Sequence, residues 1–242
     1  MKKPKNKLVA DLHVHTVASG HAYSTLQEYV TQAKKIGLKA IAITDHGPAM
    51  PGGAPMYHFS NLRMVPGEMD GVRIYRGAEC NIIDQSGRLD LPDEVLDTLD
   101  IVMIAMHPRV GYESMGEDVN TDVLIKAMSN PYVNVVAHPG NPMYPVSIEE
   151  TVAAAKKHGV AIEINNSSFT GSRNGSWERC LEFAKKVKDE NHFVVIGTDS
   201  HITTMLGAFQ KAVELIEASG LTEKNIINTS LEKIDKCLIR AK

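Results

Sequence analysis

Metal-binding side chains recur at the ends of strand-like segments in this chain. The pattern opens with His13 and His15 in LVADLHVHT and closes with Asp199 and His201 in VVIGTDSH. Between them the same set continues with His21, His46, Glu79, His107 and His138. Imidazole and carboxylate ligands without thiolate suit Zn²⁺, Mn²⁺ or Fe²⁺ in a catalytic site, and zinc is our first choice. The sequence therefore predicts several divalent ions at one place.

The spacing of these residues supports metal binding over packing. His13 and His15 are two residues apart on a predicted strand, so both rings point to the same side. Asp199 and His201 repeat this spacing at the last strand. A single histidine at a strand end is more often structural, but nine such side chains in one pattern favour a metal site. His158 and His192 fall outside the pattern, and we expect both to be solvent-exposed.

Strand-like and helical segments alternate along the chain. We expect strands near 8–13, 39–45, 72–79, 100–107, 133–138, 160–165 and 193–199. We expect helices over 24–37, 147–159, 176–190 and 205–219, and a helical tail over 221–242. Alternation of this kind predicts parallel βα units. The chain of 242 residues is then one α/β domain (1–242), a distorted, TIM-barrel-like (β/α)7 barrel whose active site lies at the C-terminal strand ends.

Composition argues against several classes of partner. The formal net charge is −3, and no basic run follows the N-terminal lysines, which disfavours nucleic acid. No window is apolar for long enough to span a membrane, and a signal peptide is not expected. Cys80, Cys180 and Cys237 are far apart, so we expect free thiols and a cytoplasmic protein.

Several motifs together resemble the PHP (polymerase and histidinol phosphatase) family: HVHT, TDHG, HPG and TDSH. Longer stretches, among them DLHVHTVASGHAYSTL, HFSNLR and EINNSSF, resemble the YcdX-type phosphatases within it, over residues 8 to 207. The resemblance implies the PHP fold, a seven-stranded barrel that holds three metal ions, and all nine ligand positions are filled here. It also hints at a homo-oligomer.

The resemblance further implies how the ligands are divided. His13, His15, Glu79 and Asp199 would hold one ion; His21, His46 and His201 a second; and Glu79, His107 and His138 a third. Three divalent ions and two carboxylates leave a site charge of about +4, which favours an anionic substrate such as a phosphate ester. We hypothesise that a hydroxide activated by the three ions attacks phosphorus. Asp199 is the candidate catalytic residue for the proton of that water, although it could serve as a ligand alone.

Candidate substrate-binding residues lie in two loops. Arg173 follows the sixth predicted strand at the active end of the barrel. His58 and Arg63 belong to the region of a predicted lid, the loop 47–59, which is rich in proline, glycine and methionine. All three are candidates to bind the phosphate of a small phosphorylated substrate.

The resemblance favours a metal-dependent phosphatase for small phosphomonoesters, and three other functions stay open. A nuclease-like phosphodiesterase could use the same ions, but the acidic charge balance argues against it. A histidinol-phosphate phosphatase is a further alternative within the family. The last is a non-catalytic metal-binding module, which would bind metal and turn over no phosphate ester.

Overall fold

The computed structural model describes residues 7–238. Its strands are β1 (Ala10–Val14), β2 (Ala40–Ile43), β3 (Glu68–Met69), β4 (Val72–Asn81), β5 (Ile101–Ala105), β6 (Val135–Val136), β7 (Ala161–Asn165) and β8 (Val194–Gly197). Its helices are α1 (Leu26–Ile36), α2 (Met56–Asn61), α3 (Asp93–Leu96), α4 (Glu117–Met128), α5 (Ile148–His158), α6 (Ser176–Asp189), α7 (Gln210–Ser219) and α8 (Leu231–Leu238). Short 3-10 turns are η1 (Val17–Ser19), η2 (Leu62–Met64), η3 (Asn166–Phe169), η4 (Thr203–Met205), η5 (Glu223–Asn225) and η6 (Ile227–Thr229).

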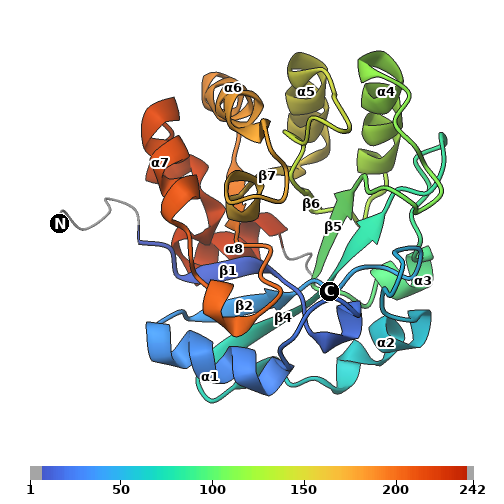
Figure 1. Cartoon of the computed structure of the whole chain (residues 1–242). Helices are drawn as coiled ribbons and strands as arrows, with labels where there is room; N and C mark the ends of the chain where they lie inside the picture. The colour runs from blue at the N-terminus through green and yellow to red at the C-terminus, as the bar shows by residue number, and fades with distance from the viewer. Residues whose placement is uncertain (1–6, 239–242) are drawn as a thin grey trace.

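Seven parallel strands form a nearly closed barrel with helices around its outside (Figure 1). The strand order is β1-β2-β4-β5-β6-β7-β8, and β3 pairs antiparallel with β4. The predicted α/β barrel and its seven strands are thus confirmed. The short strand β3 was not predicted from the sequence. Residues 239–242 of the predicted tail lie outside the described residues.

Local sequence signals set the helix ends. Thr25 caps α1 and forms a reciprocal capping box with Glu28, and Gly37 ends the helix in the left-handed conformation. Ser147 caps α5 in a similar way, through the N–H of Glu150. These signals place both helices within two residues of the predicted ranges.

The seam between β1 and β8 is closed by few backbone hydrogen bonds and by polar side chains. A single bridge joins Val14 to Ser200. Asp11 accepts hydrogen bonds from the hydroxyl and the N–H of Thr198, at 2.6 and 3.1 Å. The amide of Asn228 donates to carbonyls on both strands, those of Ala10 and Ile196. This polar seam is where the barrel departs from regular closure.

The barrel interior is apolar in the part that α8 covers and polar at the C-terminal ends of the strands. Alternate strand residues such as Leu12, Met103 and Val195 form a buried cluster that α8 covers with Ile234 and Leu238. A second, larger apolar cluster fills the space between the sheet and the outer helices. The upper interior, at the C-terminal strand ends, is left for polar side chains.

A register shift in β1 positions the first two histidines. The pairing of β1 with β2 shifts between Asp11 and Val14. Leu12 therefore belongs to the interior cluster, while the next residue, His13, also reaches the interior and contacts Glu163 of β7. A bulge changes which side chains face inward, so strict alternation along β1 would have misplaced one of them.

The cysteines and two histidines outside the metal pattern differ in how far they match the predictions. Cys80 is fully buried, and all three cysteines are free thiols. His158 is exposed as predicted, but the prediction for His192 is wrong, because its Nε2 lies 2.8 Å from the carbonyl oxygen of Val160 in a buried position. Within residues 7–238 we find no helix with the length and apolar character that crossing a bilayer requires.

Candidate metal centre

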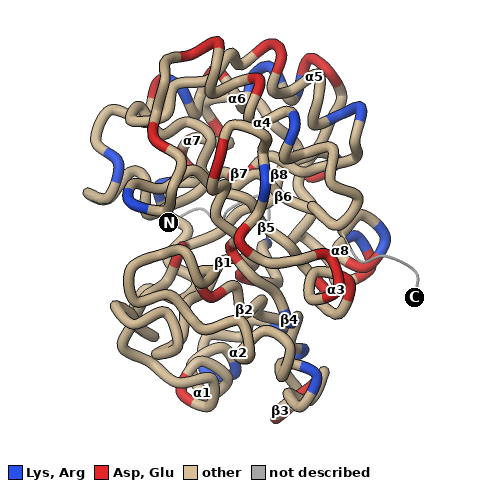
Figure 2. Tube along the Cα trace, turned by 90° about the vertical axis from the view of Figure 1, so that its right-hand side faces the viewer, with Lys and Arg blue, Asp and Glu red and all other residues tan. Residues whose placement is uncertain are grey.

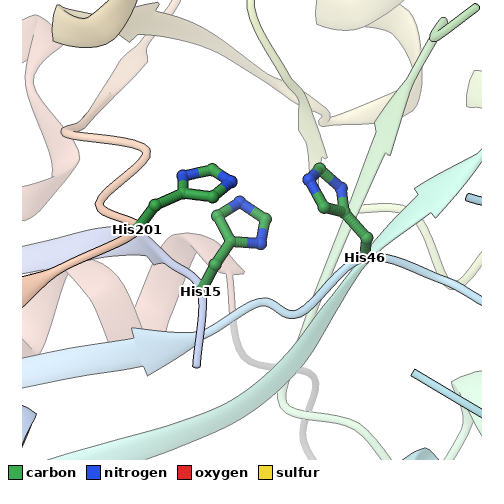
Figure 3. Close-up of side chains that lie close together, drawn as sticks. All are labelled: His15, His46 and His201. Carbon is green, nitrogen blue, oxygen red and sulfur yellow. The ribbon is translucent and has the colours of Figure 1, made fainter. Parts of the chain in front are cut away.

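The nine predicted ligands gather at the C-terminal mouth of the barrel. They come from β1, β2, β4, β5, β6 and β8 or from the loops that follow these strands: His13, His15, His21, His46, Glu79, His107, His138, Asp199 and His201. Three groups of their ligand atoms lie within 4.8 Å of one another: His15, His46 and His201; His13, His15 and Asp199; and His46, Glu79 and His107. Figure 3 shows the first group, whose rings come from three separate strand ends.

His13 and His15 face a common point. Nε2 of His13 lies 3.0 Å from Nε2 of His15 and 3.5 Å from Oε2 of Glu79. Nε2 of His15 lies 3.1 Å from Oδ1 of Asp199. Two imidazole nitrogens and two carboxylates at such distances are suited to a shared cation.

Glu79 lies at the centre of the cluster and uses its two oxygens in different directions. Oε2 lies 2.8 Å from Nδ1 of His46. Oε1 lies 2.8 Å from Nε2 of His138 and 3.6 Å from Nε2 of His107. One carboxylate therefore reaches histidines on both sides of the mouth, as a bridging ligand would.

His21 and His201 complete the outer side of the cluster. The ring of His21 stacks on the rings of His46 and His201, with centroids 5.0 and 4.8 Å away. The ring of His201 lies 4.4 Å from that of His15. His21 is the exposed member of the set, and it belongs to none of the three close groups.

The protonation states of three buried groups, His15, Glu79 and Asp199, suit a cation site. Burial and the neighbouring His46 lower the pKa of His15 to about 3, which keeps its ring neutral. Burial favours protonation of Glu79, but the imidazoles of His13, His107 and His46 hold its pKa well below the usual range. Burial also opposes a charge on Asp199, yet His13 and Arg173 hold the pKa of this carboxyl low. Both carboxylates are thus ionised.

Unpaired buried atoms provide a test of whether metal ions fit. Nδ1 of His46, Oε2 of Glu79 and Nε2 of His107 are buried and make no hydrogen bond within the described part of the chain; the first two lie 2.8 Å apart without the geometry of a hydrogen bond. Buried polar atoms almost always have a partner, so three orphans that face one another indicate a missing ligand. The donor set, six imidazoles and two carboxylates at the core plus His21, fits divalent metal ions.

Groups that the sequence reading did not single out fix the ligand rings from behind. Glu163 lies 2.7 Å from Nδ1 of His13, and Ser19 Oγ lies 3.2 Å from Nδ1 of His15. The hydroxyl of Ser19 donates in turn to Asp45, at 2.7 Å. Asn81 holds the ring of His107. A charged residue inside the apolar run AIEIN was the one signal that could have identified Glu163.

The three predicted substrate residues occupy different positions. Arg173 enters the site, where its Nη1 lies 3.1 Å from Oδ2 of Asp199. His58, on α2, lies 3.3 Å from Oδ2 of Asp45, behind the metal cluster. Arg63 is exposed on η2. The structure therefore brings Arg173 to the mouth, turns His58 toward Asp45 and leaves Arg63 exposed on η2.

Comparison with known proteins agrees with this arrangement. A protein named "probable phosphatase" from Thermoanaerobacter sp. is 46% identical over 232 residues, which cover 96% of this chain and 95% of that protein. A "probable phosphatase" from Acetivibrio thermocellus is 47% identical over 236 residues, 98% of this chain and 97% of the other.

A solved structure shares the fold at low sequence identity. Histidinol phosphate phosphatase from Lactococcus lactis, in complex with zinc, L-histidinol and phosphate, superposes with a TM-score of 0.64 and 19% identity, over 88% of this chain and 94% of that one. The model of the PHP domain family matches residues 11–228. With its metal-competent barrel mouth and this match, the chain belongs to the PHP domain family.

Proposed function

We propose that this chain is a metal-dependent phosphatase that hydrolyses small phosphomonoesters. The observation that carries the proposal is the convergence of imidazoles on Glu79, which reaches His46 with one oxygen and His138 with the other. The names of the relatives support a phosphatase, and the zinc in the Lactococcus lactis enzyme supports zinc as the metal.

The metal complement is part of the proposal. His13, His15, Glu79 and Asp199 hold one ion; His21, His46 and His201 hold a second; and Glu79, His107 and His138 hold a third. Zinc fits these ligands, and manganese or iron would also fit them. When bound, the ions neutralise phosphate oxygens and lower the pKa of a water molecule.

Two side chains of the protein, those of Arg173 and Asp199, act on the substrate phosphate and on the attacking water. Arg173 has a guanidinium at the mouth, held by Asp199 at 3.1 Å and by Ser172 at 3.2 Å, and it binds the phosphate of the substrate. Asp199, whose Oδ2 pairs with Arg173, orients the attacking water or accepts its proton. His58 and Arg63, in the lid region, make secondary contacts with the substrate.

Two alternatives differ in the substrate. A nuclease-like phosphodiesterase needs a basic groove for nucleic acid, and Figure 2 shows lysine and arginine interspersed with aspartate and glutamate along the outer helices. The histidinol phosphate phosphatase shares the fold at 19% identity, which gives no reason to choose its substrate. The continuous barrel and the family match over residues 11–228 support a single domain, and free thiols at all three cysteines fit a cytoplasmic enzyme.

Phosphate release from a panel of substrates tests the proposal. The panel contains small phosphomonoesters, an aryl phosphodiester, an oligonucleotide and histidinol phosphate, each with zinc-loaded protein. We expect release from monoesters, its loss in Asp199→Asn, and no change in Asp189→Asn, an exposed carboxylate on α6. Cleavage of diesters alone would indicate the nuclease, and bound zinc without turnover of the panel would indicate a metal-binding module.

A further inference from the structure

Glu163 is a buried carboxylate at the centre of β7, the one strand of the parallel barrel that contributes none of the nine predicted ligands. The residue as a whole is 1% exposed. It accepts hydrogen bonds from Nδ1 of His13 at 2.7 Å, from the backbone N–H of His138 at 2.9 Å and from Nδ2 of Asn165 at 3.1 Å. All three of these partners are donors, so both carboxylate oxygens of Glu163 act as acceptors.

The two oxygens of Glu163 serve histidines on opposite sides of Glu79. Oε1 holds His13, whose Nε2 faces His15 and Asp199. Oε2 holds the backbone of His138, whose Nε2 faces Oε1 of Glu79. Glu163 therefore connects two groups of metal-competent atoms that do not share a histidine.

We propose that Glu163 is a positioning residue that couples two of the metal positions, so that they fill together. The inference rests on the proposed metal centre and adds a residue and a mechanism of cooperation to it. Glu163 acts through His13 and His138 and touches neither metal nor substrate.

The effect on His13 concerns its tautomer. An ionised carboxylate only accepts hydrogen bonds, so Nδ1 of His13 must carry the hydrogen that points to Oε1. Nε2 then presents its lone pair to the mouth, where the other ligands converge. A carboxylate behind a histidine ligand fixes the ring and increases its basicity.

The effect on His138 concerns the backbone. His138 has φ of +34°, a conformation that residues other than glycine seldom adopt. Oε2 of Glu163 accepts the N–H of this residue, which holds the turn after β6 in the form that directs the ring to Glu79. Without that acceptor the turn can relax and withdraw its ligand.

Gly197 of β8 provides the room for this arrangement. A Cβ atom on Gly197 would lie 2.3 Å from Oε1 of Glu163 and 2.6 Å from Cβ of His13. Its φ is not among the positive values, so space, and not backbone conformation, is what requires a glycine here. The close contact of Glu163 with His13 thus depends on three strands, β1, β7 and β8.

The test is stepwise zinc binding by Glu163→Gln, measured by titration in metal buffers and by bound zinc per chain after dialysis. Glutamine has the same shape, but its NH₂ must face one of the N–H donors. We expect affinity at two positions to fall about 10- to 100-fold and the cooperativity between them to disappear. Asp100→Asn is the control, because Asp100 is a half-buried carboxylate at the start of β5, away from the C-terminal strand ends, and it pairs with Arg76. It should keep wild-type zinc binding.

A spectroscopic measurement covers the case in which Glu163→Gln fails to fold. In zinc-loaded wild type with ¹⁵N-labelled histidine, we expect His13 to show a protonated Nδ1 and a metal-bound Nε2. The opposite tautomer, or unchanged stepwise affinities in Glu163→Gln, would overturn the inference. Weakened zinc binding in a protein that hydrolyses no phosphate ester would instead defeat the proposed function and leave the role of Glu163 intact.

Discussion

The amide of Asn81 holds the ring of His107 in one orientation, with Oδ1 of Asn81 2.9 Å from Nδ1 of the histidine. Nδ2 of the same amide donates to Oδ2 of Asp90 at 2.6 Å. A carboxylate accepts only, so the amide cannot be flipped and its oxygen must face His107. Nδ1 of His107 therefore carries the hydrogen, and Nε2, which makes no hydrogen bond among residues 7–238, is directed to Glu79 in the cluster of predicted ligands.

The first prediction concerns this link. Asn81→Ala should free the ring of His107 and weaken zinc binding at that position about 10- to 100-fold, with a comparable loss of phosphatase activity. Zinc titration and phosphate release measure the two effects. Asn130→Ala, which removes an amide that bonds to Asp93 on the surface, is the control. Equal zinc affinities in the two variants would contradict the assignment.

The nine metal-competent residues could be predicted because parallel strands bring their C-terminal ends to one rim of a barrel. Residues such as His46 and His107 each follow an apolar run, so position along the strand was enough to locate them. Their grouping depends on side-chain directions. The structure puts His15 in close groups both with His201 and with Asp199, and places His21 outside them, which spacing along the chain does not encode.

The supporting residues were not predictable in the same way. Ser19, Asp45 and Asn81 look like ordinary loop or strand-end residues, and their role appears only when strands far apart in sequence become neighbours. The lid illustrates the point. Ala49 N–H donates to Asp90 and His58 of α2 lies against Asp45, so the segment 47–59, predicted as a loop but helical from Met56 on, contacts two of the groups that support the ligands.

The second prediction uses the tight packing at Gly197. Gly197→Ala should displace either Glu163 or His13, since the added Cβ would overlap both, and repacking a filled interior costs about 1–3 kcal/mol. We expect a lower melting temperature and weaker zinc binding. Gly67→Ala is the matched control, because nothing lies within 4 Å of a Cβ there and its φ is not among the positive values. Similar zinc affinity in the two variants would show that the interior can rearrange around the added Cβ atom without disturbing the ligands.

The third prediction concerns Arg173. Arg173→Ala should raise KM for a phosphomonoester about 10-fold or more, because a buried charged hydrogen bond to phosphate contributes about 1.5–3 kcal/mol. Bound zinc should stay at the wild-type level, since Arg173 supplies no metal ligand. Arg88→Ala, which removes an exposed arginine paired with Asp84, should leave KM unchanged. A loss of zinc from Arg173→Ala would assign this residue to holding Asp199 in place.

The last prediction follows from the seam of the barrel, where Asp11 is buried between β1 and β8. Burial raises its pKa from 3.8 to about 6, against the opposing hydrogen bonds from Thr198 and Gly207. Between these two values the unfolded chain has lost the proton of Asp11 and the folded chain retains it. The unfolded state then binds fewer protons, so stability falls as pH rises from about 4 to about 6 and is level beyond that range.

Between about pH 4 and about pH 6, Asp11 lowers the free energy of unfolding by on the order of 3 kcal/mol. Asparagine cannot ionise, so Asp11→Asn removes this part of the pH dependence, although it costs stability at every pH by disturbing the bonds to Thr198. Urea unfolding of metal-free protein at pH 4, 5, 6 and 7 measures the difference between the two proteins. We expect the advantage of wild type over Asp11→Asn to shrink as pH rises. A constant difference would mean that Asp11 is ionised at the seam already at pH 4.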